Sequence, residues 1–323
     1  MAEYKNIKGF EIQSLDSDPS NPIVGQVWYN STTQILKGTI AGGAASGTWS
    51  SGGNLNQARS QNAGCGIQTA GLCVGGESGP TYSTLSEEYN GTSWTEGNDL
   101  NTGRAFLTAL GLQTAALAVG GYDGGSTYGL VESYNGTSYT EVNDLNTARN
   151  SSASSGIQTA GLVFGGGPPA GGLTEEYDGT NWTESGDLNT SRRTLAGSGT
   201  QTASLAFGGS SDPGVNLAVT EEYNGTSWTE VSDLNTARSA LAGGGTQTSA
   251  LAFGGTAFVA ITESWNGSSW TEVADLAIGR REFGGFGATG SLGLACGGNT
   301  GSYSNSTEEF TAPDIATVSF DVS

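Results

Sequence analysis

The chain has 323 residues, a formal net charge of −20, 54 glycines and no histidine. Without His, Ser-His-Asp and Cys-His catalytic sets are excluded, and the negative charge argues against nucleic-acid binding, which needs clustered Lys and Arg. No stretch approaches the roughly 18 consecutive apolar residues of a membrane span, and the N-terminus lacks the apolar core of a signal peptide. We therefore expect a soluble protein made in a cytoplasm, with no insertion into a membrane.

The first 47 residues differ from the rest, since they hold all three lysines of the chain. Residues 17–38 begin as an extended stretch punctuated by prolines and continue as a small hairpin, with 27–30 predicted to pair with 34–37. A segment this short cannot bury its own core, so we expect Trp28, Tyr29, Ile35 and Leu36 to need a partner surface. The alternative is that this arm packs on the repeat region of its own chain, described below.

The sequence GQVWYN at residues 25–30 resembles the N-terminal segments of tailed-bacteriophage virion proteins, tail fibres included. In those proteins a short hairpin of this kind precedes a variable distal domain. The resemblance implies that residues 1–47 dock the chain onto other virion proteins, in several copies on one assembly.

From residue 48 onward a repeat runs through nearly the whole chain, which is the sequence signature of a repeat architecture. Gly-Gly pairs recur every 43–46 residues and begin at Gly75, Gly120, Gly165, Gly208, Gly254 and Gly297. An aromatic residue recurs at Trp49, Trp94, Tyr139, Trp182, Trp228 and Trp270. Ten residues after each aromatic comes an arginine: Arg59, Arg104, Arg149, Arg192, Arg238 and Arg280. Length varies mainly between the Gly-Gly pair and the next aromatic, which marks one variable loop per unit.

Each unit is predicted to contain four strands. Before Gly-Gly, large residues such as Leu72 and Val74 alternate with small ones, which suits a strand covered on both faces. A hairpin then follows, with its turn at Asn90-Gly91 or at Gly91-Thr92. Under either turn, Tyr89 and Trp94 project from the same face of the sheet.

The two ends of the repeat are complementary halves. Trp49 has no Gly-Gly pair and no Glu-Tyr ahead of it in register, and Glu309-Phe310 has no Trp after it. We therefore predict that residues near 48–55 supply the fourth strand of a sheet whose other strands come from about 281–311. Such sharing closes a ring and leaves no exposed sheet edge.

The order Gly-Gly, Glu-x-Tyr, Trp and a distant Arg resembles the kelch repeat. The predicted fold is all-β: a six-bladed kelch-like β-propeller of four-stranded antiparallel blades, closed by an N-terminal strand and preceded by a short extended arm with a small hairpin. The expected domains are the arm at 1–47, the propeller at 48–312 and a C-terminal tail at 313–323.

One Glu per unit stands two residues before the aromatic of the third strand: Glu87, Glu132, Glu175, Glu221, Glu263 and Glu308. With the six repeat arginines these offer one ion pair per blade. We predict inter-blade structural pairs, and a charged ring lining a channel is the alternative.

The remaining polar features indicate no metal and no cofactor. Asp99 and its equivalents begin loops, where accepting backbone N–H bonds is favoured over binding a cation. Cys65, Cys73 and Cys296 are odd in number and lack CxxC spacing, so free buried thiols are predicted.

In a four-stranded meander, the variable loops share a face with the Asp-containing loops. Aromatic residues on the variable loops, which suit sugar stacking or a protein partner, are Tyr82, Tyr122, Tyr128, Phe258 and Tyr303. Ordinary exposed aromatics are the alternative.

We predict a non-enzymatic bacteriophage virion structural protein, a tail fibre or particle-decorating protein, located in the virion. Its variable loops would contact a host-surface glycan or protein. A free-standing bacterial lectin or adhesion propeller is the alternative, and a propeller glycosidase is a third possibility because loop acids such as Asp123 and Asp212 are present.

Overall fold

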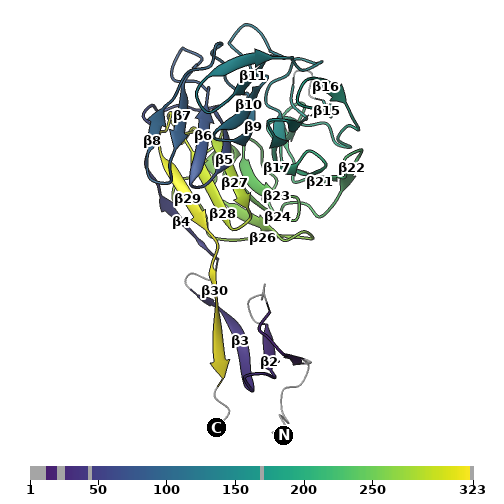
Figure 1. The fold of residues 1–323 in the computed structure, drawn as a ribbon. Coiled ribbons are helices and arrows are strands. Elements are labelled where there is room, and N and C mark those ends of the chain that lie inside the picture. The colour runs from purple at the N-terminus through teal and green to yellow at the C-terminus, as the bar shows by residue number, and fades with distance from the viewer. Residues whose placement is uncertain (1–11, 20–25, 43–45, 168–170, 321–323) are drawn as a thin grey trace. The chain divides into compact units, whose positions relative to one another are not determined.

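The computed structural model describes residues 12–19, 26–42, 46–167 and 171–320 (Figure 1). The fold is all-β, and the one helical element among these residues is the short 3-10 turn η1 (Thr256–Phe258). The chain divides into two compact units, one of residues 48–311 and one formed by residues 1–47 with residues 312–323. Each unit is described by itself below.

Leaving out residues 168–170, residues 48–311 form six four-stranded antiparallel sheets. Their first strands are β5 (Ala63–Ile67), β9 (Thr108–Leu112), β13 (Ala153–Ile157), β17 (Ala196–Thr200), β23 (Ala242–Thr246) and β27 (Gly284–Thr289). Their second strands are β6 (Ala70–Val74), β10 (Ala115–Val119), β14 (Ala160–Phe164), β18 (Ala203–Phe207), β24 (Ser249–Phe253) and β28 (Leu292–Cys296). Their third strands are β7 (Ser86–Tyr89), β11 (Val131–Tyr134), β15 (Thr174–Tyr177), β21 (Thr220–Tyr223), β25 (Thr262–Trp265) and β29 (Thr307–Thr311). Their fourth strands are β8 (Trp94–Glu96), β12 (Tyr139–Val142), β16 (Trp182–Glu184), β22 (Trp228–Glu230), β26 (Trp270–Glu272) and β4 (Thr48–Ser51). A small additional hairpin, β19 (Ser210–Ser211) with β20 (Val215–Asn216), lies in the variable loop of the fourth sheet.

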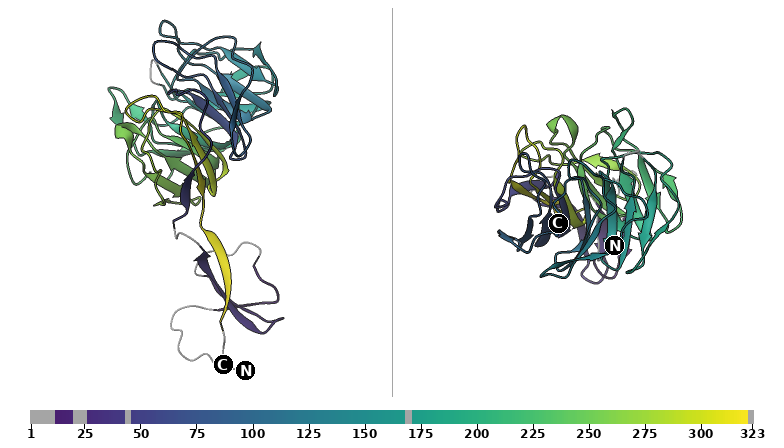
Figure 2. Two further views of the ribbon diagram at one scale, coloured as in Figure 1. Left: turned by 90° about the vertical axis from the view of Figure 1, so that its left-hand side faces the viewer. Right: turned by 90° about the horizontal axis from the view of Figure 1, so that it is seen from above.

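The sheets follow one another around a common axis, and two further views show them from other sides (Figure 2). The first strand of each sheet lies against the first strand of the next, and β27 of the last sheet lies against β5 of the first. This arrangement of residues 48–311, called the ring below, is consistent with a β-propeller.

Large side chains of one sheet pack on small residues of the next. Phe164 on β14 faces Gly197 on β17, where an added Cβ would lie 2.5 Å from the ring carbon Cζ. Phe207 on β18 meets Gly243 on β23 in the same way, at 2.4 Å. The glycine content of the first strands therefore follows from close packing between neighbouring sheets.

The last sheet joins both ends of the ring. Strand β4 pairs with β29, and Trp49 lies opposite Phe310 as the sequence predicted. The hairpins of the other sheets follow the second of the two predicted turns, because Tyr89 pairs with Trp94 and Gly91-Thr92 stand at the centre of the loop. The rings of Tyr89 and Trp94 are 4.9 Å apart between centroids, on one face of the sheet.

The second unit contains strands β1 (Gln13–Leu15), β2 (Val27–Asn30), β3 (Ile35–Gly42) and β30 (Asp314–Phe320). Strands β2 and β3 form the predicted hairpin, and β1 runs parallel to β2. Strand β30 pairs with β3 over its whole length, from Asp314 opposite Gly42 to Phe320 opposite Leu36. The prediction of a C-terminal tail at 313–323 is thereby corrected, since this segment contributes an edge strand whose pairing with β3 satisfies the backbone groups on one of its sides.

Candidate functional site

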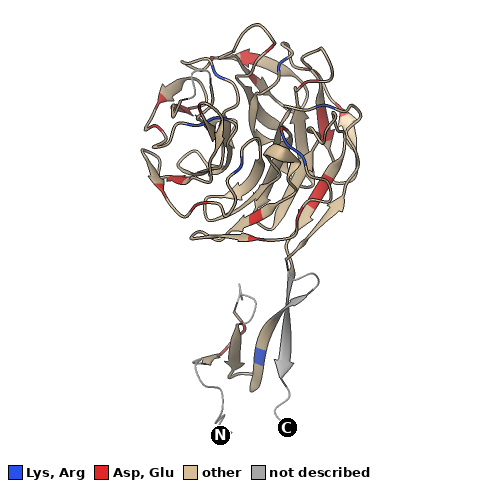
Figure 3. Cartoon of the chain, turned by 180° about the vertical axis from the view of Figure 1, so that it is seen from behind, with Lys and Arg blue, Asp and Glu red and all other residues tan. Residues whose placement is uncertain are grey.

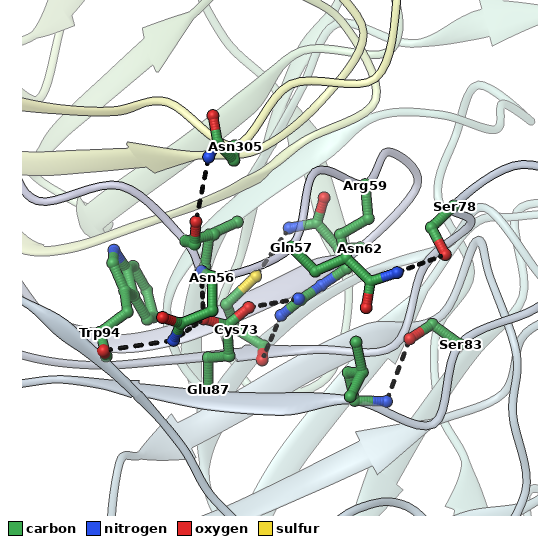
Figure 4. A network of polar contacts seen from close by, with 12 residues as sticks. Asn56, Gln57, Arg59, Asn62, Cys73, Ser78, Ser83, Glu87, Trp94 and Asn305 are labelled. Atoms are coloured by element: carbon green, nitrogen blue, oxygen red, sulfur yellow. Dashed lines mark hydrogen bonds and ion pairs between the residues drawn. The ribbon is translucent and has the colours of Figure 1, made fainter.

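The repeat arginines and glutamates lie inside the ring. Every pair forms an ion pair: Arg59–Glu87, Arg104–Glu132, Arg149–Glu175, Arg192–Glu221, Arg238–Glu263 and Arg280–Glu308. Arg59 is fully buried, with its Nη1 2.5 Å from Glu87 Oε1 and its Nη2 donating to the carbonyl of Cys73 (Figure 4). Glu87 Oε2 in turn accepts bonds from the backbone and side-chain nitrogens of Asn56.

Each repeat arginine also connects two sheets. The carbonyl oxygen of Arg104 accepts a 2.9 Å bond from the N–H of Gly76 in the preceding sheet, while its guanidinium pairs with Glu132 in its own sheet. The same contact closes the ring, because Gly298 of the last sheet donates to the carbonyl of Arg59. The ion pair thus lies within one sheet, and the arginine carbonyl joins that sheet to the Gly-Gly pair of the preceding one.

The predicted docking residues of the arm are only partly exposed. Trp28 has no exposed surface and Leu36 has 8%, whereas Tyr29 and Ile35 are half-buried. Asp18 organises this unit, since its carboxylate accepts bonds from Trp28 Nε1, Asn30 Nδ2 and Lys37 Nζ. The expectation that Trp28 and Leu36 need an external partner is corrected, because the chain itself covers them.

Two opposite faces of the ring differ in what they display. On one, called the loop face, the variable loop after β6 meets the connection between β8 and β9, where Leu100 N–H donates to Thr84 O at 2.9 Å. The other, called the turn face, carries the loops between third and fourth strands, with Gly91 beside Thr69. In the last sheet Thr311 and Thr48 take the places that Asn90 and Ser93 hold in the first. The ring therefore begins and ends at the turn face.

The predicted Asp residues form hydrogen bonds within the loop face. Four of them accept a backbone N–H bond at the start of a third strand, at 3.0–3.2 Å: Asp144, Asp187, Asp233 and Asp275. Asp99 accepts instead from the Thr84 hydroxyl. The expected role in stabilising turns is confirmed for the four.

Four of the five predicted aromatic residues gather on adjoining sheets of the loop face. Tyr82 and Tyr122 meet edge to face, with ring centroids 5.9 Å apart. Tyr303, 36% exposed, donates from its hydroxyl to Glu77 Oε1 at 2.5 Å. Tyr128 donates to Asp123 at 2.6 Å. These residues come from the last, first and second sheets, so segments distant in sequence contribute to one surface.

Phe258 extends this surface on the fifth sheet. Its ring is 39% exposed and lies 5.0 Å from the guanidinium carbon of Arg281. Arg281 bonds through its backbone to Asn299, and Asn299 bridges to Tyr303. We call the five aromatic residues the aromatic arc: Phe258, Tyr303, Tyr82, Tyr122 and Tyr128.

Hydrogen bonding sets the charge state of the arc. The bonds from Tyr128 and from the backbone of Ser126 and Gly125 lower the pKa of Asp123 to about 2. The contact with Glu77 raises the pKa of Tyr303 above its usual value. At neutral pH Tyr128 and Tyr303 are therefore neutral phenols and Asp123 is a carboxylate, a combination that binds hydroxyl groups and apolar faces.

Acidic residues lie over all parts of the ring rather than in one patch (Figure 3). The described residues contain no group of three or more His, Cys, Asp and Glu side chains placed to hold a metal ion. The three cysteines are buried and free, as predicted. Among the residues with described structure, no helix is long and apolar enough to cross a membrane.

At the axis of the loop face stands a circle of six residues that sequence reasoning missed. Each lies two positions after a repeat arginine: Gln61, Phe106, Ser151, Thr194, Ala240 and Glu282. Each N–H donates to the carbonyl of the residue before it in the circle, from Phe106 to Gln61 and so on round to Gln61 to Glu282, at 2.6–3.0 Å. We call these residues the mouth ring. The sequence did contain a signal for these positions. Each lies two residues after a repeat arginine, and the residue type differs from one repeat to the next.

All six residues of the mouth ring have a positive φ, between 52° and 57°. For residues other than glycine this conformation costs on the order of 1–3 kcal/mol, and it is a marked outlier for a β-branched residue such as Thr194. All six residues that share the circle of hydrogen bonds also share this conformation.

Below the mouth ring a channel of about 450 Å³ follows the axis, lined by the first strands of the sheets. At its far end, on the turn face, Ile67, Leu112 and Ile157 are exposed. The loop face thus combines an aromatic arc, a strained ring of varied side chains and a channel opening. No family model and no curated protein sequence matches this chain.

Proposed function

We propose that residues 48–311 form a six-bladed kelch-like β-propeller in a non-enzymatic virion structural protein of a tailed bacteriophage. Residues 1–47 dock the protein onto other virion proteins, and the loop face contacts the host surface. The resemblance of residues 25–30 to phage attachment segments supports the location. The clustering of the aromatic arc supports recognition, because rigid scaffolds commonly carry binding residues on loops.

The observation that carries this proposal is the placement of the chain ends of the ring. Thr48 and Thr311 both lie at the turn face, opposite the aromatic arc. The covalent connections to residues 1–47 and 312–323 therefore leave the ring at the turn face, and the loop face carries neither of them. An enzymatic role has less support, because the chain has no histidine and the Glu residues of the repeat are buried in ion pairs.

Incorporation into particles tests the docking. Phage carrying a Trp28→Ala and Asp18→Ala change, which removes a buried side chain and a carboxylate with three bonds, should assemble particles that lack this protein. Circular dichroism of the purified variant should still show a folded ring. Full incorporation of the variant, or equal incorporation of a chain without residues 1–47 and 312–323, would show that docking does not depend on the arm. Absence of the wild-type protein from particles would instead favour a free-standing lectin or adhesion module.

A further inference from the structure

The mouth ring departs from the pattern that most positive-φ positions of the chain follow. Among the described residues most positions with positive φ are glycine, as expected for a backbone conformation that a Cβ disfavours. Nine residues other than glycine share this conformation, and six of those nine form the mouth ring. A chain with 54 glycines uses none at these six positions.

The backbone alone does not explain these side chains. Glycine would support the circle of hydrogen bonds at least as well, because it adopts positive φ without steric penalty. The neighbouring arginine is the same in all repeats, yet the six positions hold six different residue types. Strain at varied residues around a channel opening is typical of functional sites. We infer that the side chains of the mouth ring are retained for contact with a ligand.

Three consecutive residues of the mouth ring come from the same sheets as residues of the aromatic arc. Glu282, Gln61 and Phe106 belong to the last, first and second sheets, which also carry Tyr303, Tyr82 and Tyr122. Gln61 Oε1 is buried and has no hydrogen-bond partner among the described residues. All three residues line the channel, and they contribute an amide with an unpaired carbonyl oxygen, a carboxylate and an aromatic ring.

The carboxylate of Glu282 is weakly engaged by its own chain. Its nearest cation is Arg281, with Nε 3.9 Å from Oε2, beyond hydrogen-bond distance. Acceptor oxygens of this kind suit hydroxyl donors, and Phe106 suits the C–H face of a sugar ring. A net charge of −20 disfavours anionic ligands. The channel volume of about 450 Å³ falls within the range of small-molecule sites.

We propose that Gln61, Phe106 and Glu282 form a pocket at the channel mouth that takes the terminal residue of a neutral saccharide. This proposal rests on the proposed host-surface role and names its ligand class. The preceding residues of the saccharide run outward over Tyr82 and Tyr303. The mouth ring then selects the terminal sugar, and the aromatic arc contributes affinity along the chain.

Glycine substitutions separate this role from a structural one. The full-length protein is first tested for binding to an array of neutral oligosaccharides, with sialylated oligosaccharides as the anionic set. Calorimetry then measures the affinity for each saccharide that binds. Phe106→Gly, Gln61→Gly and Glu282→Gly should each weaken binding at least tenfold. Their melting temperatures should equal or exceed that of the wild type, because glycine relieves the positive-φ strain.

Ser151→Gly and Ala240→Gly are matched controls, because they make the same backbone change at mouth-ring positions outside the proposed pocket. They should bind like the wild type. The proposal is overturned if the three pocket variants bind normally, if the controls lose binding equally, or if only anionic saccharides bind.

Binding to intact host cells distinguishes this proposal from the proposed function. If Tyr82→Ala and Tyr303→Ala abolish cell binding while the pocket variants do not, the mouth pocket is refuted and the host-surface role stands. If the wild type binds neutral saccharides through the pocket but binds no host cell, the host-surface role fails while the pocket stands.

Discussion

Trp49 and Phe310 lie directly opposite each other across the pair of strands β4 and β29, with ring centroids 5.4 Å apart. The indole N–H of Trp49 also donates to Thr262 Oγ1 at 3.0 Å, and its ring meets Phe253 edge to face. One side chain near the start of the ring therefore connects its last sheet to the sheet before it.

Trp49→Ala should lower the free energy of unfolding of the ring by about 2–4 kcal/mol, because it removes a large, half-buried side chain and leaves a cavity. Urea denaturation followed by circular dichroism measures the change. Trp28→Ala, in the other unit, is the control and should leave the ring transition in place. A loss below about 1 kcal/mol for Trp49→Ala would show that β4 adds little to closure.

Arg104→Met should destabilise the ring by about 3–5 kcal/mol, because it leaves Glu132 as a buried carboxylate without its cation. Adding Glu132→Leu to this variant should restore part of the loss, since an apolar pair of similar volume carries no unpaired charge. Denaturant unfolding of the two single variants and the double variant measures the coupling. Equal stability of Arg104→Met and the wild type would contradict a structural role for the Arg104–Glu132 pair.

Gly76 and Gly79 form a matched pair for the Gly-Gly motif. Both have positive φ, but a Cβ on Gly76 would lie 2.6 Å from the Ser60 carbonyl oxygen, whereas Gly79 has nothing within 4 Å. Gly79→Ala should cost about 1–2 kcal/mol from backbone strain alone. Gly76→Ala should cost a further 1–3 kcal/mol, roughly, from overpacking. Similar melting temperatures for the two variants would argue against close packing at the motif.

The arm should respond to acid through Asp18. Bonds from Lys37, Asn30 and Trp28 lower the pKa of Asp18 to about 2, below its ordinary value of about 3.9. Its contribution to stability is thus complete above about pH 4 and disappears as the pH falls through about 2.

The NMR signal of the Trp28 indole N–H reports this titration and should shift with a midpoint near pH 2. Lys37→Met should raise that midpoint toward about 4, because the amine makes the largest contribution to the lowered pKa. An unchanged midpoint would exclude Lys37 as the main cause.

The sequence alone determined what each repeat must do locally. Strands, the hairpin register alternatives, the Arg–Glu pairing and the Trp49–Phe310 closure follow from spacing, because residues that recur in every unit serve contacts that every unit makes. The loop face was also predictable, since a four-stranded meander places alternate connections on the same side.

Only the tertiary structure decided which residues from different repeats lie next to one another. The mouth ring depends on six backbones meeting at one axis, and the contact of Tyr82 with Tyr122 depends on the conformation of two loops of different sequence. The pairing of β30 with β3 and the burial of Trp28 involve segments that occur once, so no repetition revealed them. Periodicity reports constraints within a unit, whereas convergence at an axis or a shared surface is set by packing in three dimensions.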